Sequence, residues 1–138
     1  MQLSQLFSLA TLASAVSAIT VSYDQGYDKG DRSLTSVACS DGPNGLITRK
    51  HWNFQRDIPR FPFIGGAYDV AGWNSPNCGA CWEIKYNGNK IYMLSVDHAD
   101  NGFNMALGAM NALTNGQAVQ LGRVEAEASR TDLKNCGL

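Results

Sequence analysis

Apolar and polar residues alternate along much of the chain in a way that predicts mainly β structure. In residues 19–23, apolar side chains at odd positions alternate with polar ones, which is the period of a half-buried strand. Residues 82–86 and 91–97 predict two further strands, and the Asn87-Gly88 pair between them is typical of a hairpin turn. The second of these strands is almost entirely apolar, so we expect it to be the central one.

Less regular patterns predict the segments between these strands. Residues 34–39 are expected to form a short strand, and residues 46–55 to include a helical turn. Two prolines exclude a longer helix and set an extended path over residues 58–64. The Gly65-Gly66 pair that follows predicts a loop.

One helix is predicted near the end of the chain. Apolar residues recur at helical spacing over residues 103–113, and Asn115-Gly116 then supplies a left-handed stop. Residues 118–128 return to a strand pattern with a bulge at Gly122, where the alternation changes phase. Many short strands with one late helix predict a small β-barrel.

Residues 1–18 have the composition of a secretory signal peptide. Every Lys, Arg, Asp and Glu lies at or beyond Asp24, and an apolar stretch over residues 3–13 is followed by five small residues. The stretch is too short to span about 30 Å of hydrocarbon, so we expect no stable membrane insertion. Cleavage after Ala18 would leave one secreted domain, residues 19–138, because no repeat or long linker divides it.

The charge balance excludes one class of partner. The chain has 11 Lys and Arg against 12 Asp and Glu, a formal net charge of −1. Neither a basic excess nor a run of like charges is available to neutralise phosphates. We therefore expect no binding to nucleic acid.

Four cysteines, Cys39, Cys78, Cys81 and Cys136, predict two disulfides in a secreted chain, and three connectivities exist. A bridge between Cys78 and Cys81 would resemble a redox motif, but such motifs precede a helix and this one runs into a predicted strand. We favour Cys39–Cys78 and Cys81–Cys136, because each closes a long loop worth about 4 kcal/mol in the loop-entropy model. Neither histidine lies at metal-ligand spacing, so no metal and no cofactor are expected.

Longer motifs give the chain its most specific signature. They are Ser22-Tyr23-Asp24, Cys39-Ser40-Asp41-Gly42, Ile58-Pro59-Arg60-Phe61-Pro62, Ala71-Gly72-Trp73-Asn74-Ser75-Pro76-Asn77-Cys78-Gly79, Val96-Asp97-His98-Ala99 and Ala109-Met110-Asn111-Ala112-Leu113-Thr114-Asn115-Gly116. Through these motifs, residues 19–138 resemble the cerato-platanin family of small proteins secreted by filamentous fungi.

This resemblance implies a mainly β fold, a six-stranded double-psi β-barrel with one or two short helices, kinship with expansins, and the same two disulfides. It also implies an extracellular or cell-wall protein that elicits plant defence and binds chitin or N-acetylglucosamine oligomers. Two further partners are implied. One is plant cell-wall polysaccharide, which such proteins loosen in the manner of expansins without detectable cleavage, and the other is a plant receptor. The implied oligomeric state is a monomer that assembles at interfaces.

Two other functions remain open at this point. A glycan hydrolase or lytic transglycosylase would need two carboxyl groups about 5 to 9.5 Å apart, and Asp97 is the best single candidate. Asp24, Asp28 and Asp100 are the potential partners, but Asp97 is equally explained as a strand-end carboxylate that accepts backbone hydrogen bonds. We therefore expect no catalytic residue. The second alternative is a surface-active structural protein, which low charge and many aromatic residues would favour.

By resemblance to the family's oligosaccharide-contacting loop, the expected carbohydrate-binding residues are Asp97, Asn101, Gly102, Phe103 and Asn104. Three of them have structural alternatives: loop geometry for Gly102, a contact between helix and barrel for Phe103, and a helix N-cap for Asn104. The tryptophans Trp52 and Trp73 are either stacking platforms for sugar rings or packing residues.

Overall fold

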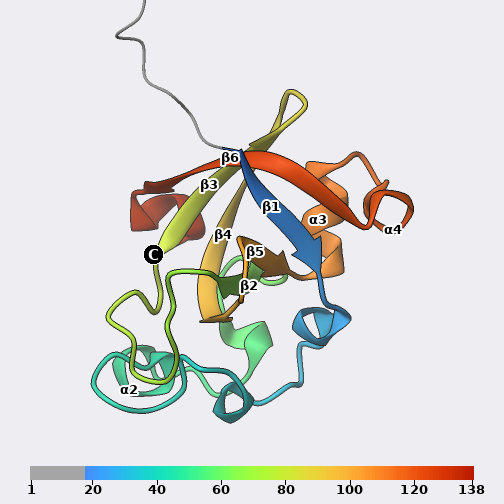
Figure 1. Ribbon diagram of the computed structural model, residues 1–138. Coiled ribbons are helices and arrows are strands. Elements are labelled where there is room, and N and C mark those ends of the chain that lie inside the picture. Colours follow the sequence, from blue (N-terminus) through green and yellow to red (C-terminus); the bar gives the residue numbers. More distant parts are fainter. Residues whose placement is uncertain (1–17) are drawn as a thin grey trace, which may run out of the picture.

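Six strands close into a barrel in the computed structural model, which describes residues 18–138 (Figure 1). The strands are β1 (Ala18–Tyr23), β2 (Ile64–Ala67), β3 (Cys81–Tyr86), β4 (Asn89–His98), β5 (Phe103–Met105) and β6 (Arg123–Thr131). They are hydrogen-bonded in the order β1-β5-β2-β4-β3-β6. The expected six-stranded barrel is confirmed, whereas the predicted signal peptide, except for Ala18, lies outside the described residues.

Short helices occupy the connections between strands. Those of the described residues are η1 (Gln25–Asp28), η2 (Leu34–Ser36), α2 (Leu46–Lys50), η3 (Gln55–Asp57), α3 (Leu107–Leu113), α4 (Ala118–Leu121) and η4 (Leu133–Cys136). None of these helices is long and apolar enough to cross a bilayer.

The predicted strands over residues 19–23, 82–86 and 91–97 are confirmed as β1, β3 and β4. The β3–β4 hairpin turns at Asn87 and Gly88, which adopt φ values of 50° and 86°. Positive φ at both positions matches the twist of the flanking strands. Strand β4 pairs in parallel with β2 and antiparallel with β3, but the closed barrel has no central strand, because each of its strands has two neighbours.

The prediction of a loop at Gly65-Gly66 is wrong, because both glycines lie in the buried strand β2. A Cβ on Gly65 would lie 2.6 Å from the Asn104 carbonyl oxygen, and one on Gly66 would lie 2.7 Å from the His98 carbonyl oxygen. The glycines therefore allow β5 and β4 to approach β2 closely, a role that local sequence rules interpret as a loop.

The predicted helix over residues 103–113 is only partly correct. Residues Phe103–Met105 form β5, and the helix begins at Leu107. Asp28, far away in sequence, fixes this boundary: its carboxylate accepts hydrogen bonds from the backbone N–H groups of Leu107 at 2.7 Å and Gly108 at 2.8 Å. A carboxylate at a helix N-terminus satisfies backbone donors that have no partner within the helix.

One more strand prediction is wrong, and another is only partly correct, because the strand predicted over residues 118–128 begins at Arg123, as β6. Residues 34–39 begin with η2, whose N-cap Ser33 accepts a hydrogen bond from the Thr35 N–H. Residues 118–121 form α4, and Gly122, at φ 71°, ends this helix rather than forming a bulge. The alternation of Val119 and Leu121 suggested a strand, but both side chains are exposed.

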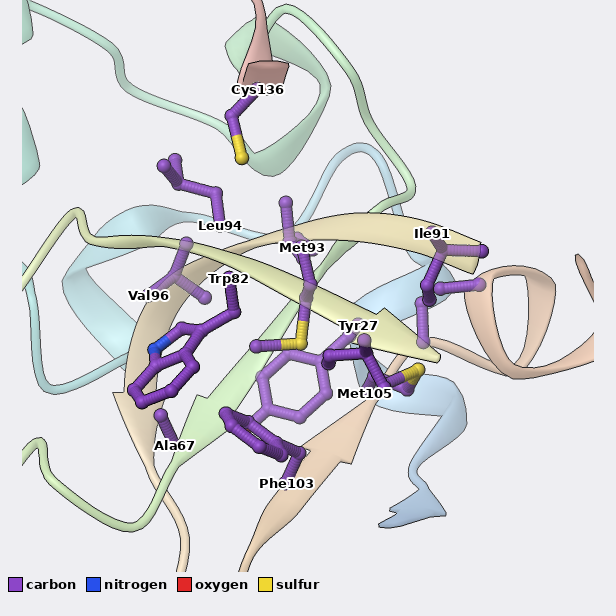
Figure 2. Packing of buried hydrophobic residues seen from close by; sticks show 14 of the residues in the cluster. Tyr27, Ala67, Trp82, Ile91, Met93, Leu94, Val96, Phe103, Met105 and Cys136 are labelled. Carbon is purple, nitrogen blue, oxygen red and sulfur yellow. The ribbon is translucent and has the colours of Figure 1, made fainter. Parts of the chain in front are cut away.

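Apolar side chains fill the barrel interior, where Met93, Phe103 and Met105 are fully buried (Figure 2). The predicted disulfides Cys39–Cys78 and Cys81–Cys136 are confirmed, with Cα–Cα distances of 5.5 and 5.9 Å. They span 39 and 55 residues. The first joins the loop after η2 to the loop before β3, and the second attaches the C-terminal η4 to β3.

Candidate functional site

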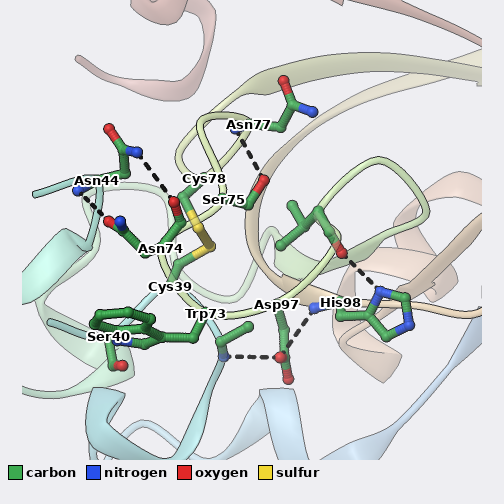
Figure 3. Close-up of a disulfide and its surroundings, with 12 residues drawn as sticks. Cys39, Ser40, Asn44, Trp73, Asn74, Ser75, Asn77, Cys78, Asp97 and His98 are labelled. Atoms are coloured by element: carbon green, nitrogen blue, oxygen red, sulfur yellow. Dashed lines mark hydrogen bonds between the residues drawn. A yellow bond between two sulfur atoms is a disulfide. The ribbon is translucent and has the colours of Figure 1, made fainter. Parts of the chain in front are cut away.

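Asp97 lies near the end of β4, and both of its carboxylate oxygens accept hydrogen bonds. Figure 3 shows the two that Oδ1 accepts. Oδ2 accepts from the Tyr27 hydroxyl at 2.7 Å. Oδ1 accepts from the backbone N–H groups of Ala38 and His98, each at 2.9 Å. Asp97 therefore ties η1 and the segment after η2 to the end of β4.

The Tyr27 hydroxyl is a fixed donor in this arrangement. Burial raises the pKa of Tyr27 strongly, and the hydrogen bond to Asp97 raises this pKa further. The phenol thus stays protonated and donates to the carboxylate. Asp97 has the contacts of a structural carboxylate, which is one of the two roles that the sequence left open.

The three carboxylates considered as partners for Asp97 also have contacts of their own. Asp24 accepts the Gly26 N–H at 2.8 Å. Asp28 caps α3, and Asp100 accepts a hydrogen bond from His98 Nε2 at 3.0 Å while remaining 93% exposed. None of these contacts links Asp24, Asp28 or Asp100 directly to the Asp97 carboxylate.

His98, the last residue of β4, lies between two acceptors. Its Nδ1 is 2.6 Å from the Val70 carbonyl oxygen, and its Nε2 is 3.0 Å from Asp100 Oδ1. Neither a carbonyl nor a carboxylate oxygen can donate, so only the doubly protonated imidazolium satisfies both contacts. The hydrogen bond to Val70 and then that to Asp100 raise the pKa of His98.

A hollow of about 510 Å³ opens beside this histidine, and we call it the loop hollow. Its lining residues are Ser22, Tyr23, His98, Ala99, Asp100, Asn101, Asn104 and Arg123. They come from β1, the end of β4, the β4–β5 loop, β5 and the start of β6. Within it, the Ser22 hydroxyl donates to Asn104 Oδ1 at 3.0 Å, which orients that amide.

The structure separates the five residues predicted to bind carbohydrate. Asn101 and Asn104 line the loop hollow, whereas Asp97, Gly102 and Phe103 are not among its lining residues. Gly102 has φ 54°, and a Cβ there would lie 1.9 Å from the Thr20 carbonyl oxygen. Phe103 is fully buried, with its ring centroid 5.0 Å from that of Trp82. Gly102 serves loop geometry and Phe103 the barrel core.

The predicted carbohydrate-binding residues did not include five polar residues that line the hollow: Ser22, Tyr23, His98, Asp100 and Arg123. Only His98 and Asp100 carried a local signal, because they lie between the predicted residues Asp97 and Asn101. The side chains of Asp97 and His98 do point to different partners, as expected for neighbours on a strand. The other three residues reach the site only because β1 pairs with both β5 and β6.

The two tryptophans left open by the sequence differ in exposure. Trp52 is partly buried against the core, which is a packing role. Trp73 is 62% exposed, and its indole N–H donates to Asp41 Oδ1 at 2.7 Å. This hydrogen bond is the main cause that lowers the pKa of Asp41. No group of three or more His, Cys, Asp and Glu side chains within residues 18–138 is arranged to hold a metal ion.

Comparisons with known proteins cover nearly the whole described chain. A family model described as Cerato-platanin matches residues 19–138. The chain is 48% identical over 118 residues to "Allergen Asp f 15" of Aspergillus fumigatus, covering 86% of this chain and 76% of that protein. It is 38% identical over 132 residues to "Cerato-platanin" of Ceratocystis fimbriata f. sp. platani, covering 94% of this chain and 95% of that protein.

Solved structures show the same similarity in three dimensions. The crystal structure of cerato-platanin 1 from M. perniciosa has a TM-score of 0.83 at 42% identity and covers 86% of this chain and 99% of that one. The solution structure of "the fungal elicitor Cerato-Platanin" has a TM-score of 0.78 at 39% identity, covering 86% of this chain and 96% of that one.

Proposed function

We propose that this chain, which belongs to the cerato-platanin family of elicitor proteins, is secreted and binds N-acetylglucosamine oligomers without cleaving them. On this proposal it acts outside the fungal cell, as an elicitor and as a non-cleaving loosener of wall polysaccharide. The loop hollow is the binding site.

The composition and position of the loop hollow carry this proposal. Sugar hydroxyls are recognised by planar groups that donate and accept hydrogen bonds, and Asn101, Asn104 and Arg123 bring amide and guanidinium groups to one side of the barrel. His98 adds a ring whose position is fixed by the Val70 carbonyl. The site is therefore largely preformed, which lowers the entropic cost of binding.

The contacts of the carboxylates support binding rather than hydrolysis. Hydrolysis requires one carboxyl group to donate a proton and a second to act as base or nucleophile. Asp97 is committed to Tyr27, Ala38 and His98, and Asp28 to the N-terminus of α3. Neither can leave these partners without exposing backbone donors.

Titration of the protein with N-acetylglucosamine hexamer, followed by NMR, tests the proposal. We expect weak binding, in the high micromolar to millimolar range, or about −4 to −6 kcal/mol. The amide signals of Asn101 and Asn104 should shift together, and Asn101→Ala should weaken binding. Asn53→Ala, which removes an exposed amide outside the hollow, is the matched control. Shortened oligomer in the same samples would support the hydrolase instead, and the absence of any shift would contradict the binding site.

Surface activity is a second candidate function. Val119 and Leu121, both on α4, are 60% and 41% exposed, which places two apolar side chains on one short helix. Exposed apolar groups adsorb to an air–water interface because this removes them from water. Film formation should fall in a variant with both residues changed to Ser, while binding of the hexamer stays unchanged. Equal film formation by this variant would reject the α4 surface.

A further inference from the structure

Trp73 is an exposed aromatic side chain that the structure nevertheless holds in one orientation. Its side chain is 62% exposed, while its indole N–H donates to Asp41 Oδ1 at 2.7 Å. The ring also lies directly against residue 42, where a Cβ would be 2.8 Å from the ring atom Cζ2. Gly42 thus leaves the space in which the indole rests.

The loop that carries Trp73 is itself held by several contacts (Figure 3). Asn74 Oδ1 accepts the Asn44 backbone N–H at 2.9 Å, and the Asn44 side-chain amide donates to the Asn74 carbonyl at 3.0 Å. The Cys39–Cys78 disulfide fixes the same loop four residues further along. A ring held this way loses little freedom when it binds a ligand, unlike an ordinary exposed side chain.

Polar atoms around the indole remain available for a ligand. One polar atom of each of three side chains makes no hydrogen bond to another described residue: Asp41 Oδ2, Asn44 Oδ1 and Asn74 Nδ2. The other polar atom of each side chain is hydrogen-bonded, which holds the group in place. A flat aromatic face beside a carboxylate and two amides matches a pyranose ring, which presents C–H groups on its face and hydroxyls at its edge. These three polar residues include no cation that would attract an anionic lipid surface.

Trp73 also lies near the loop hollow along the chain. His98, which lines the hollow, contacts the Val70 carbonyl, and Val70 precedes Trp73 by three residues. The Cα atoms of Val70 and Trp73 are therefore at most about 11 Å apart. Figure 3 shows Trp73 and His98 on opposite sides of Asp97. A ligand that reaches both must be longer than one sugar ring.

We propose that Trp73, with Asp41, Asn44 and Asn74 around it, is a stacking subsite for one pyranose ring of a glycan whose other rings occupy the loop hollow. This inference rests on the proposed function and adds to it a dependence on ligand length. A long oligomer contacts both places, whereas a short one reaches only the hollow. Asp41 acts in two ways, since its Oδ1 orients Trp73 and its Oδ2 remains available to a sugar hydroxyl.

Isothermal titration with the dimer and the hexamer of N-acetylglucosamine tests the subsite. Trp73→Ala should bind the hexamer about tenfold more weakly than the wild type and the dimer equally well. Trp73→Tyr keeps a stacking ring and should recover most of the lost affinity. Val119→Ala removes an apolar side chain of similar exposure from α4 and should leave binding of both oligomers unchanged.

The role of Asp41 has its own readout. Asp41→Ala should shift the NMR signal of the Trp73 indole N–H and weaken hexamer binding, while Asp41→Asn, which keeps an oxygen acceptor, should restore both. Equal hexamer affinity of wild type and Trp73→Ala would overturn the subsite and leave the proposed function standing. Failure of the wild type to bind either oligomer would overturn both. A blue shift of Trp73 emission with phosphatidylcholine vesicles but not with hexamer would assign the ring to a lipid surface and overturn the inference.

Discussion

The Tyr27 hydroxyl donates to Asp97 Oδ2 at 2.7 Å, joining two residues that are 70 positions apart in sequence. The same carboxylate accepts the Ala38 N–H, so three segments of the chain meet at one side chain. This arrangement makes Asp97 a support of the site: it holds the start of the β4–β5 loop in place through the His98 N–H.

Removing the Tyr27 hydroxyl should therefore destabilise the fold. We expect Tyr27→Phe to lower the free energy of unfolding by about 1.5 to 3 kcal/mol, because the Tyr27 hydroxyl donates to a carboxylate and the Tyr27 side chain is buried. Urea unfolding measures this change. Tyr92→Phe is the control, since the Tyr92 hydroxyl makes no side-chain hydrogen bond among the described residues. Equal stability of both variants would contradict the structural role of Asp97.

Adding a methyl group at Gly102 should destabilise the fold far more than adding one at a glycine that has positive φ and open space around it. Gly102→Ala should cost at least about 2 kcal/mol, because backbone strain adds to a clash with the Thr20 carbonyl. Gly116→Ala isolates the strain, since Gly116 has φ 82° and open space around its Cα. Thermal unfolding compares the two. Equal stability of Gly102→Ala and Gly116→Ala would contradict the close packing of the loop on β1.

The pKa of His98 should lie above its ordinary value of 6.5. A raised folded-state pKa means that the stabilisation is fully present below the unfolded-state value and is lost as pH rises through the folded-state value. The wild type should thus lose stability relative to His98→Gln as the pH increases above 6.5. NMR titration of the imidazole ring measures the pKa directly. A value at or below 6.5 would contradict the doubly bonded imidazolium.

Each disulfide should stabilise the fold by constraining a long loop in the unfolded chain. Replacing either pair of cysteines by Ser should cost about 2 to 5 kcal/mol, and the loss of Cys39–Cys78 should also release the Trp73 loop. Denaturant unfolding gives the stability, and the indole N–H signal of Trp73 reports the loop. An unchanged signal without Cys39–Cys78 would show that the Asn44–Asn74 hydrogen bonds suffice.

Local patterns predicted those parts of the fold that depend on neighbouring residues. Alternation identified β1, and a nearly continuous apolar run identified β4. Asn87-Gly88 marked the hairpin that joins β3 to β4, because few other residues adopt positive φ twice in succession. For the candidate site, the motif around Asp97 pointed to a loop that borders the hollow, and Asn101 and Asn104 line this hollow.

By itself, the sequence determined the regular strands, the family and the cysteine pairs, because period, turn chemistry and motif order are properties of adjacent residues. The tertiary structure decided where distant segments meet. Gly65-Gly66 forms a strand because β4 and β5 press against it, and helix α3 begins where Asp28 reaches its N–H groups. The loop hollow likewise exists only because barrel closure brings Arg123 beside the loop that carries Asn101.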